Sequence, residues 1–275
     1  MILINAQSTG FTVGKYPDGT PAITANYDLL RTWYNRQGYL EIEWFYENMD
    51  ELFSVYLIAK YLKEKIGSNI CLHMPYIPNA RMDRTKSSSD VATMKYFADM
   101  INALEFTEVT VLDPHSTTVE NTIKNLVIVP PIRFIKSALS DIKDIDLIFY
   151  PDHGSESRYE TIHKEFNLPY LSGYKQRNWK TGKIEKLQIV GDTASIEGKN
   201  ILIVDDICSK GGTFLYAAKA LKEYGANDIY LYVTHCENTM LDGEMINSGL
   251  IKKIYTTDSI YQKEHSLINV FPIIE

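Results

Sequence analysis

The sequence predicts an α/β protein built on mainly parallel sheets. Short apolar runs alternate with longer amphipathic segments along most of the chain, and strand, helix and strand in repetition are typical of this class. Hydrophobic residues make up 45% of the 275 residues, which is enough to build a sizeable core. The apolar runs also end in polar clusters, as strands that lead into a ligand site do.

Seven apolar runs are the candidate strands, and three segments with apolar residues every three or four positions are the candidate helices. The strands are expected at Glu41–Tyr46, Ile70–Pro75, Glu108–Asp113, Asp146–Tyr150, Asn200–Asp205, Asp228–His235 and Lys252–Tyr255, and the helices at Asp50–Ile66, Asp90–Leu104 and Gly212–Tyr224. A polar stretch at residues 138–144 precedes a new strand. It predicts a boundary between two domains, 1–140 and 141–275.

Charge and composition exclude several classes of protein. The net charge of −7 argues against a general nucleic-acid binder, because contact with a phosphate backbone needs a basic surface. The three cysteines form no CxxC pair and no zinc spacing, which suggests reduced thiols. We see neither a secretory signal nor an apolar stretch of about 20 residues that could span a membrane. We therefore expect a cytoplasmic protein with no nucleic-acid or membrane partner.

The most informative segment is the strand that ends in Asp205 and Asp206, followed by the residues Ser209, Lys210, Gly211, Gly212 and Thr213. Glycines let a backbone approach a phosphate closely, and a helix N-terminus offers free N–H groups to it. The two carboxylates are placed to accept hydrogen bonds from sugar hydroxyls or to hold a metal ion. The alternative is that they only cap the following turn.

This segment resembles the phosphoribosyl-binding motif of type I phosphoribosyltransferases and of ribose-phosphate pyrophosphokinases. Four further segments resemble motifs of the pyrophosphokinases, in the order and at about the spacing of that family: MPYIPNARMDR at 74–84, VLDPHS at 111–116, YPDHG at 150–154 and YKQR at 174–177. The resemblance implies two phosphoribosyltransferase-like domains, the first binding ATP and the second binding a ribose phosphate. It covers about residues 70–235, and the first 65 residues match weakly.

The resemblance also implies an activity and the residues that carry it. In that family a diphosphate moves from Mg-ATP to the anomeric hydroxyl of ribose 5-phosphate. Lys175 and Arg177 match the catalytic Lys-x-Arg, although an exposed basic hairpin is the alternative. His115 and Asp152 match the residues that ligate Mg²⁺, and an ordinary structural histidine is the alternative.

Two further segments match the family's ATP contacts. Arg81, Asp83 and Arg84 would face ATP, with Met82 where the family often has glutamine; a surface ion-pair cluster is the alternative. Tyr16 and Asp18, with Gly19, resemble a turn that reaches the adenine of a neighbouring subunit. This turn predicts a homo-oligomer, although Pro-Asp-Gly is also an ordinary turn.

Two departures limit what the resemblance implies, the first about the acceptor and the second about feedback control and the usual hexamer. The family's phosphate-binding loop has Asp and Thr where this chain has Ser209 and Lys210, and the terminal helix of typical members has no counterpart before Glu275. Ribose 5-phosphate is the expected acceptor, and ADP-ribose is the alternative because an added lysine suits a substituted 5-phosphate. A non-catalytic regulatory homologue and a phosphoribosyltransferase that uses a base are the remaining hypotheses.

Overall fold

The computed structural model describes residues 1–82, 85, 87–116, 118–177 and 184–274, with only the backbone described over 175–177 and 184–186. The chain divides into two compact units, Met1–Pro130 and Pro131–Ile273. The division falls before the helix α5 (Ile132–Ile142), which contacts strands of the second unit. The predicted boundary at 140/141 therefore lies at the end of this helix, ten residues later than the observed one.

The first unit is built on a five-stranded sheet of order β1-β4-β5-β6-β7, in which only β1 runs antiparallel to its neighbour. Its strands are β1 (Ile2–Ile4), β4 (Leu40–Trp44), β5 (Ile70–His73), β6 (Val109–Leu112) and β7 (Leu126–Val129). Its helices are α1 (Tyr27–Gln37), α2 (Asp50–Lys65), α3 (Thr93–Asn102) and α4 (Thr118–Thr122).

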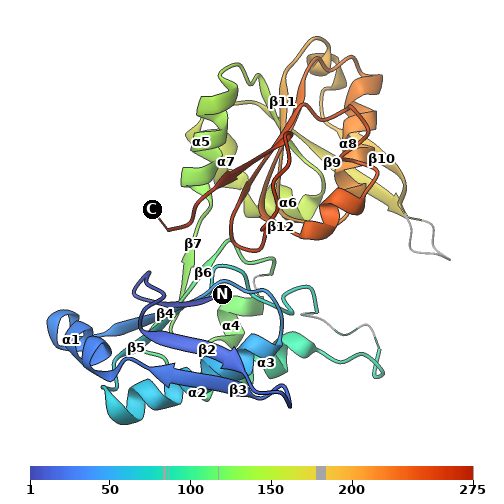
Figure 1. Cartoon of the computed structure of the whole chain (residues 1–275). Helices are drawn as coiled ribbons and strands as arrows, with labels where there is room; N and C mark the ends of the chain where they lie inside the picture. Colours follow the sequence, from blue (N-terminus) through green and yellow to red (C-terminus); the bar gives the residue numbers. More distant parts are fainter. Residues whose placement is uncertain (83–84, 86, 117, 178–183, 275) are drawn as a thin grey trace. The chain divides into compact units, whose positions relative to one another are not determined.

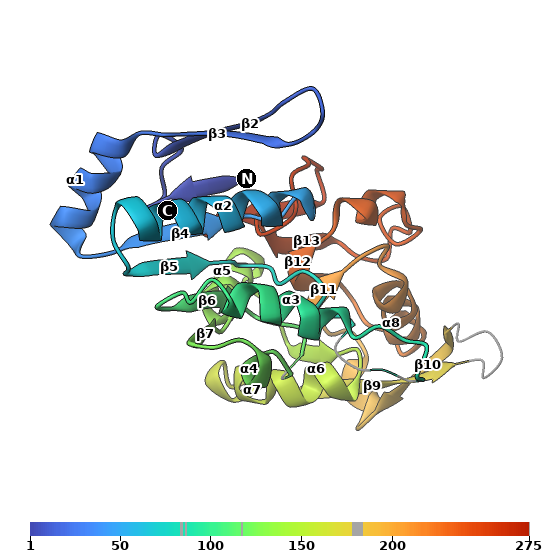
Figure 2. The same cartoon turned by 90° about the horizontal axis from the view of Figure 1, so that it is seen from below.

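One face of this sheet carries the core of the unit. The alternate strand residues Ile42 and Leu72 are fully buried in one cluster with Val55 of α2 and Phe97 of α3. A separate antiparallel hairpin of β2 (Phe11–Lys15) and β3 (Pro21–Ala25) contacts α2. Figure 2 shows this hairpin running beside α2.

The second unit contains a seven-stranded sheet of order β10-β9-β8-β11-β12-β13-β14, parallel except for β10. Its strands are β8 (Leu147–Tyr150), β9 (Tyr170–Arg177), β10 (Ile184–Val190), β11 (Ile201–Cys208), β12 (Ile229–Cys236), β13 (Lys253–Thr257) and β14 (Ile268–Phe271). Besides α5, its helices are α6 (His153–Arg158), α7 (Glu160–Glu165) and α8 (Gly212–Glu223), with two 3-10 turns, η1 (Thr193–Ile196) and η2 (Asn238–Asp242).

Helices cover both faces of this second sheet. Figure 1 shows α8 on one side of the sheet and α5 and α7 on the other. Phe214 and Leu221 of α8 are buried in one cluster with Ile203 and Leu231 of the central strands. The predicted fold class, mainly parallel sheets flanked by helices, is confirmed. Among the described residues, no helix is both long and apolar enough to cross a membrane.

Candidate functional site

The second sheet reverses its strand order between β8 and β11. From β8 the chain passes to β9 on one side, and from β11 it passes to β12 on the other. The loops that leave the carboxyl ends of β8 and β11 therefore diverge, and ligands of open α/β sheets bind at such a switch point. The first loop leads to Asp152. Asp205 and Asp206 lie near the end of β11 itself, and residues 209–213, which we call the phosphate loop, follow that strand.

Asp152 is the N-cap of α6. Its Oδ1 accepts a hydrogen bond from the backbone N–H of Ser155 at 3.0 Å, and the hydroxyl of Ser155 donates to the Asp152 carbonyl at 2.9 Å. This pairing holds the first turn of the helix, as an N-cap carboxylate does. The residue predicted as a magnesium ligand is thus also a structural cap, which the sequence pattern did not indicate.

Asp205 and Asp206 occupy different environments although they are neighbours. Asp206 is 2% exposed, and its Oδ1 lies 2.8 Å from Nη1 of Arg158 at the end of α6. The backbone N–H of Asp206 donates to Oδ1 of Asp205 at 3.0 Å. Asp205 is half-buried. The more accessible Asp205 is therefore the carboxylate of the pair better placed to meet a ligand.

The local electrostatics at Asp205 suit a cation. Burial raises the pKa of Asp205 well above its usual range, and the nearby carboxylates of Asp206 and Asp152 raise it further. Carboxylates that lie close together repel one another, so each disfavours the charged form of its neighbours. A divalent cation would offset this repulsion. Mg²⁺ suits the site because it binds to oxygen ligands and keeps several of its waters.

The phosphate loop delivers the start of α8. Gly211 is the N-cap, with φ +76 in the left-handed region, and it makes no side-chain cap. The first N–H groups of a helix have no partner within the helix, so they remain available to an anion here. Apart from its chain neighbours and the backbone of its own helix, a Cβ on Gly212 would meet no atom of the described residues within 4 Å. The protein therefore leaves room beside Gly212 where a ligand could approach the backbone.

Lys175 and Arg177 lie on β9, which runs past the end of its parallel neighbour. The last paired residues are Tyr150 of β8 and Ser172 of β9, so Arg177 lies about 16 Å further along at about 3.3 Å per residue. The backbone of β9 and β10 forms an antiparallel hairpin at this edge. The backbone that carries Lys175 and Arg177 is therefore part of a strand paired with β10, and residues 178–183 lie outside the described residues.

Gly173 allows β9 to lie close to the end of β8. A Cβ at this position would lie 2.8 Å from the carbonyl oxygen of Pro151 and 3.2 Å from Cζ of Phe149. Any larger residue would push the hairpin away from the loop that contains Asp152. The sequence motif did not identify Gly173 because its contacts come from residues distant in the sequence, at the end of β8 and in β10.

The first unit holds the residues predicted to bind ATP. Arg81 is exposed and follows β5, and His115 is half-buried and follows β6, the parallel neighbour of β5. The ends of these strands are joined by a hydrogen bond from the N–H of Leu112 to the carbonyl of Pro75 at 3.1 Å. Both residues therefore lie at the carboxyl edge of this sheet. Asp83 and Arg84 lie outside the described residues.

The turn with Tyr16 and Asp18 is held by its own hydrogen bonds. Oδ1 of Asp18 accepts from the hydroxyl of Thr20 at 2.7 Å and from its N–H at 3.0 Å, and these bonds lower the pKa of Asp18. Gly19 has φ +87, which favours glycine. Tyr16 is 60% exposed. The turn thus has the internal bonding of an ordinary tight turn and presents an uncovered aromatic ring.

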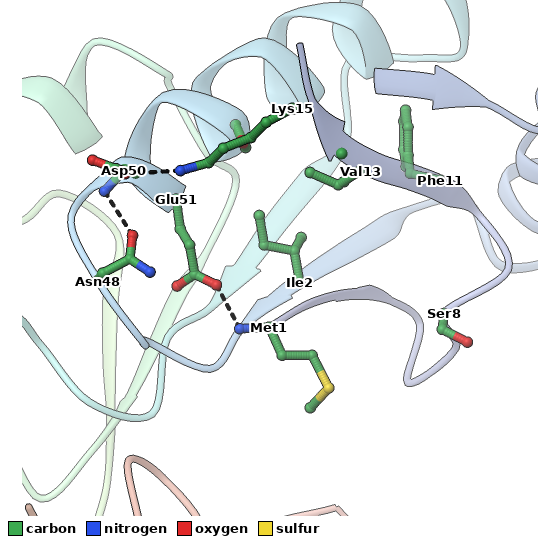
Figure 3. A pocket seen from close by; sticks show the side chains of 11 residues that line it. Met1, Ile2, Ser8, Phe11, Val13, Lys15, Asn48, Asp50 and Glu51 are labelled. Carbon is green, nitrogen blue, oxygen red and sulfur yellow. Dashed lines mark hydrogen bonds and ion pairs between the residues drawn. The ribbon is translucent and has the colours of Figure 1, made fainter. Parts of the chain in front are cut away.

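A cavity of about 420 Å³ lies between the β2–β3 hairpin and the start of α2 (Figure 3). Lys15 reaches Asp50 at 2.9 Å, and the amino group of Met1 reaches Glu51 at 2.6 Å, so these charged groups of the wall neutralise one another. The lining residues do not include Tyr16 or Asp18. The cavity is therefore separate from the motif residues.

The structure does not test a magnesium site formed by His115 and Asp152, because these residues belong to different units. Within the described part of the chain, no three His, Cys, Asp or Glu side chains form a group that could hold a metal ion. Mg²⁺ commonly keeps several waters and takes only one or two carboxylates from a protein. Asp152, as a single carboxylate, fits that mode of binding.

Comparison with known proteins agrees with the motifs. The family model of the phosphoribosyl transferase domain matches residues 132–257. Ribose-phosphate pyrophosphokinase of Bacillus subtilis is 31% identical over 231 residues, covering 81% of this chain and 69% of that protein. Ribose-phosphate pyrophosphokinase of Cereibacter sphaeroides is 30% identical over 220 residues, covering 77% of this chain. The chain spans 63% of the length of the latter, a little under two thirds.

A solved structure shows the same fold over nearly the whole chain. Phosphoribosylpyrophosphate synthetase from Mycobacterium smegmatis matches with a TM-score of 0.75 and 15% sequence identity, covering 96% of this chain and 86% of that one. At this identity the match supports the fold, and the sequence relatives support the family. The chain belongs to the ribose-phosphate pyrophosphokinase family.

Proposed function

We propose that the protein transfers the β,γ-diphosphate of Mg-ATP to the anomeric hydroxyl of ribose 5-phosphate. The hydroxyl oxygen forms a bond to the β-phosphorus of ATP, the bond between that phosphorus and the α,β-bridging oxygen breaks, and AMP leaves. The hydroxyl proton is lost, and the product is phosphoribosyl diphosphate. The relatives named ribose-phosphate pyrophosphokinase support this reaction.

The observation that carries the proposal is the start of α8 at the switch point of the second sheet. Gly211 provides a left-handed turn without a capping side chain, and Gly212 has open space beside its Cα. The 5-phosphate would accept hydrogen bonds from the first N–H groups of α8 and from the hydroxyl of Thr213. Asp205 stands at the end of the adjoining strand, where it would accept hydrogen bonds from ribose hydroxyls.

The transferred group needs cations rather than covalent help. Negative charge spreads over the oxygens of the diphosphate in the transition state, so positioning and neutralisation dominate the rate. We assign Lys175 and Arg177 to this task because their strand extends past the end of β8 at the edge where the acceptor would bind. Mg²⁺, held through Asp152 and His115, would supply the remaining charge to the ATP phosphates.

ATP would bind through the first unit. Arg81 and His115 follow neighbouring parallel strands there, and arginine suits phosphate because its planar fork donates two parallel hydrogen bonds. Asp83 and Arg84 complete the same motif. Tyr16 and Asp18 would contact the adenine of a second copy of the chain, which makes the active protein a homo-oligomer.

The experiment that tests this function is product analysis by mass spectrometry after incubation with Mg-ATP and a panel of ribose phosphates. AMP and a product heavier than the acceptor by one diphosphate are expected with ribose 5-phosphate. A matched control uses Asp205→Asn, which keeps the shape of the side chain and removes its charge. AMP formation that does not depend on any ribose phosphate would exclude the proposal.

ADP-ribose is the second candidate acceptor, and the exposed Lys210 at the edge of the phosphate loop is the observation that favours it. A substituted 5-phosphate continues outward with further charge, which a lysine at this edge can meet. The panel should therefore compare kcat/KM for ribose 5-phosphate and ADP-ribose in the wild type and in the variant Ser209→Asp/Lys210→Thr. Use of ribose 5-phosphate alone by both proteins would end this second candidate.

A further inference from the structure

The segment after β12 lies against the phosphate loop along its length. We call residues 237–245 the platform. The N–H of Glu237 donates to the carbonyl of Cys208 at 2.8 Å, at the point where β11 ends and the loop begins. Contacts to three successive loop residues then follow from three positions of the platform, and each contact fixes a different part of the loop.

The first contact involves the side chain of Ser209. The hydroxyl of Thr239 donates to Oε2 of Glu237 at 3.0 Å, and it lies 3.3 Å from the hydroxyl of Ser209. Because a hydroxyl has one proton, Thr239 accepts from Ser209 while it donates to Glu237. The hydroxyl proton of Ser209 is therefore directed to the platform.

The second contact fixes the peptide between Lys210 and Gly211. A Cβ built on Gly243 would lie 2.0 Å from the carbonyl oxygen of Lys210 and 2.9 Å from its carbonyl carbon. Because the oxygen lies nearer to this position than the carbon does, the carbonyl group of Lys210 is turned toward Gly243. In a trans peptide the N–H points opposite to the C=O. The N–H of Gly211 is therefore aimed away from the platform, toward the ligand side of the loop.

The third contact restricts the residue at the turn itself. A Cβ on Gly211 would lie 2.7 Å from both Sδ and Cε of Met245, and the φ of +76 already favours glycine. Met245 is 2% exposed, so it is a fixed part of the core beneath the loop. The turn can therefore neither sink toward the platform nor accept a larger residue at this position.

We propose that the platform positions the phosphate loop for the acceptor, with Gly243 and Thr239 as its positioning residues. This rests on the proposed function, because it assigns the acceptor's 5-phosphate to the loop. Gly243 aims the N–H of Gly211 at the phosphate, and Thr239 keeps the hydroxyl of Ser209 turned to Glu237. Neither residue touches the phosphate, so both act on acceptor binding through the loop alone.

The test compares KM for ribose 5-phosphate, KM for ATP and kcat in four variants. In Gly243→Ala the new methyl group displaces the Lys210 carbonyl, so KM for ribose 5-phosphate should rise about ten- to a hundredfold, the usual loss for a hydrogen bond to a charged group. KM for ATP and kcat at saturating acceptor should change less than threefold. Gly14→Ala is the matched control, because its Cβ would meet its nearest atom, the carbonyl oxygen of Ala22, only at 3.9 Å.

Thr239 provides a second variant pair that does not depend on how well Gly243→Ala folds. Thr239 is exposed, and Thr239→Val keeps its shape while removing the hydroxyl. Thr239→Val should raise KM for ribose 5-phosphate several-fold, and Thr239→Ser, which restores the hydroxyl, should not. Equal KM values in wild type, Thr239→Val and a folded Gly243→Ala would overturn the positioning role while leaving the proposed function intact. A wild type that releases no AMP with ribose 5-phosphate would instead remove the proposed function itself.

Discussion

Arg158 Nη1 lies 2.8 Å from Asp206 Oδ1, and this ion pair joins the end of α6 to the end of β11. The first turn of α6 is fixed by Asp152, so the pair also ties Asp152 to the strand that contains Asp205. This ion pair thus connects the two ends of the switch point. Removal of the ion pair should lower the stability of the second unit and disturb the candidate site.

The first prediction is the loss of stability in Arg158→Ala. Removing one partner of a buried pair typically costs about 3–5 kcal/mol; Arg158 is 24% exposed, so we expect about 2–3 kcal/mol in the free energy of unfolding. Urea denaturation measures this change. The double variant Arg158→Ala/Asp206→Asn should recover part of the loss, because no charge then remains buried without its cation. A single variant as stable as the wild type would show that the pair contributes nothing.

The second prediction separates the two roles of Asp152. Asparagine caps a helix about as well as aspartate but carries no charge. Asp152→Asn should therefore keep the thermal unfolding midpoint and raise the Mg²⁺ concentration needed for half-maximal activity, while Asp152→Ala should change both. Titration of activity with MgCl₂ and thermal denaturation measure the two effects. If Asp152→Asn reaches half-maximal activity at the same Mg²⁺ concentration as the wild type, Asp152 caps the helix and does not bind Mg²⁺.

The third prediction concerns Lys175 and Arg177. Each replacement by alanine should lower kcat by about a hundredfold, the typical effect of removing one donor to developing charge, or about 3 kcal/mol of barrier. The dissociation constant of ATP should change much less, because the cations act on charge that appears during transfer. Lys164→Ala is a control at an exposed lysine of α7. Near wild-type turnover in either site variant would contradict the assignment.

The fourth prediction is a pH effect in the first unit. Glu43 is 4% exposed, and burial raises its pKa to about 7, although the N–H of Ala6 donates to both carboxylate oxygens at 2.8 and 2.7 Å. In the folded protein Glu43 therefore keeps its proton up to a higher pH than in the unfolded chain, where its pKa is about 4.3. The free energy of unfolding should fall as the pH rises from about 4.3 to 7, and then stay level with respect to this group.

Glu43→Gln tests this effect. The variant should lose that fall, so its stability should differ little from that of the wild type at pH 4 and exceed it at pH 8 by roughly 3 kcal/mol. Glu64→Gln, at an exposed position of α2, is the control for removal of a negative charge. Parallel stability curves for wild type and Glu43→Gln between pH 4 and 8 would contradict the prediction. Glu41 on the same strand also has a raised pKa, so a residual slope is expected in the variant.

The strands that the sequence predicted are mostly those buried on both faces. Ile201–Val204 and Ile229–Val233 are continuous apolar runs because helices cover both sides of their sheet, and such runs are visible without a structure. Helix α1 was missed because Leu30 is its only buried residue among those described, so no apolar stripe marks it. Helix α5 was missed because the polar residues at its end resemble a linker.

The residues of the candidate site also fall into those that a local sequence pattern identifies and those that it does not. Asp205, Asp206 and the glycines of the phosphate loop are adjacent in the sequence, so their pattern could be recognised. Arg158, Gly173 and Gly243 act on partners that lie far from them in the chain. Only the order of the strands brings these residues to the same edge of the sheet, and a single sequence does not encode that order in any local pattern.

The measurement that tests the central claim most directly is ³¹P NMR of Mg-ATP and ribose 5-phosphate with the protein. Transfer of the intact β,γ-diphosphate predicts that AMP and a diphosphate bonded to C1 of the ribose appear in equal amounts, with no ADP. Lys175→Ala should give the same two signals about a hundredfold more slowly. The appearance of ADP, or of AMP with free diphosphate in the absence of a sugar-bound product, would contradict the account.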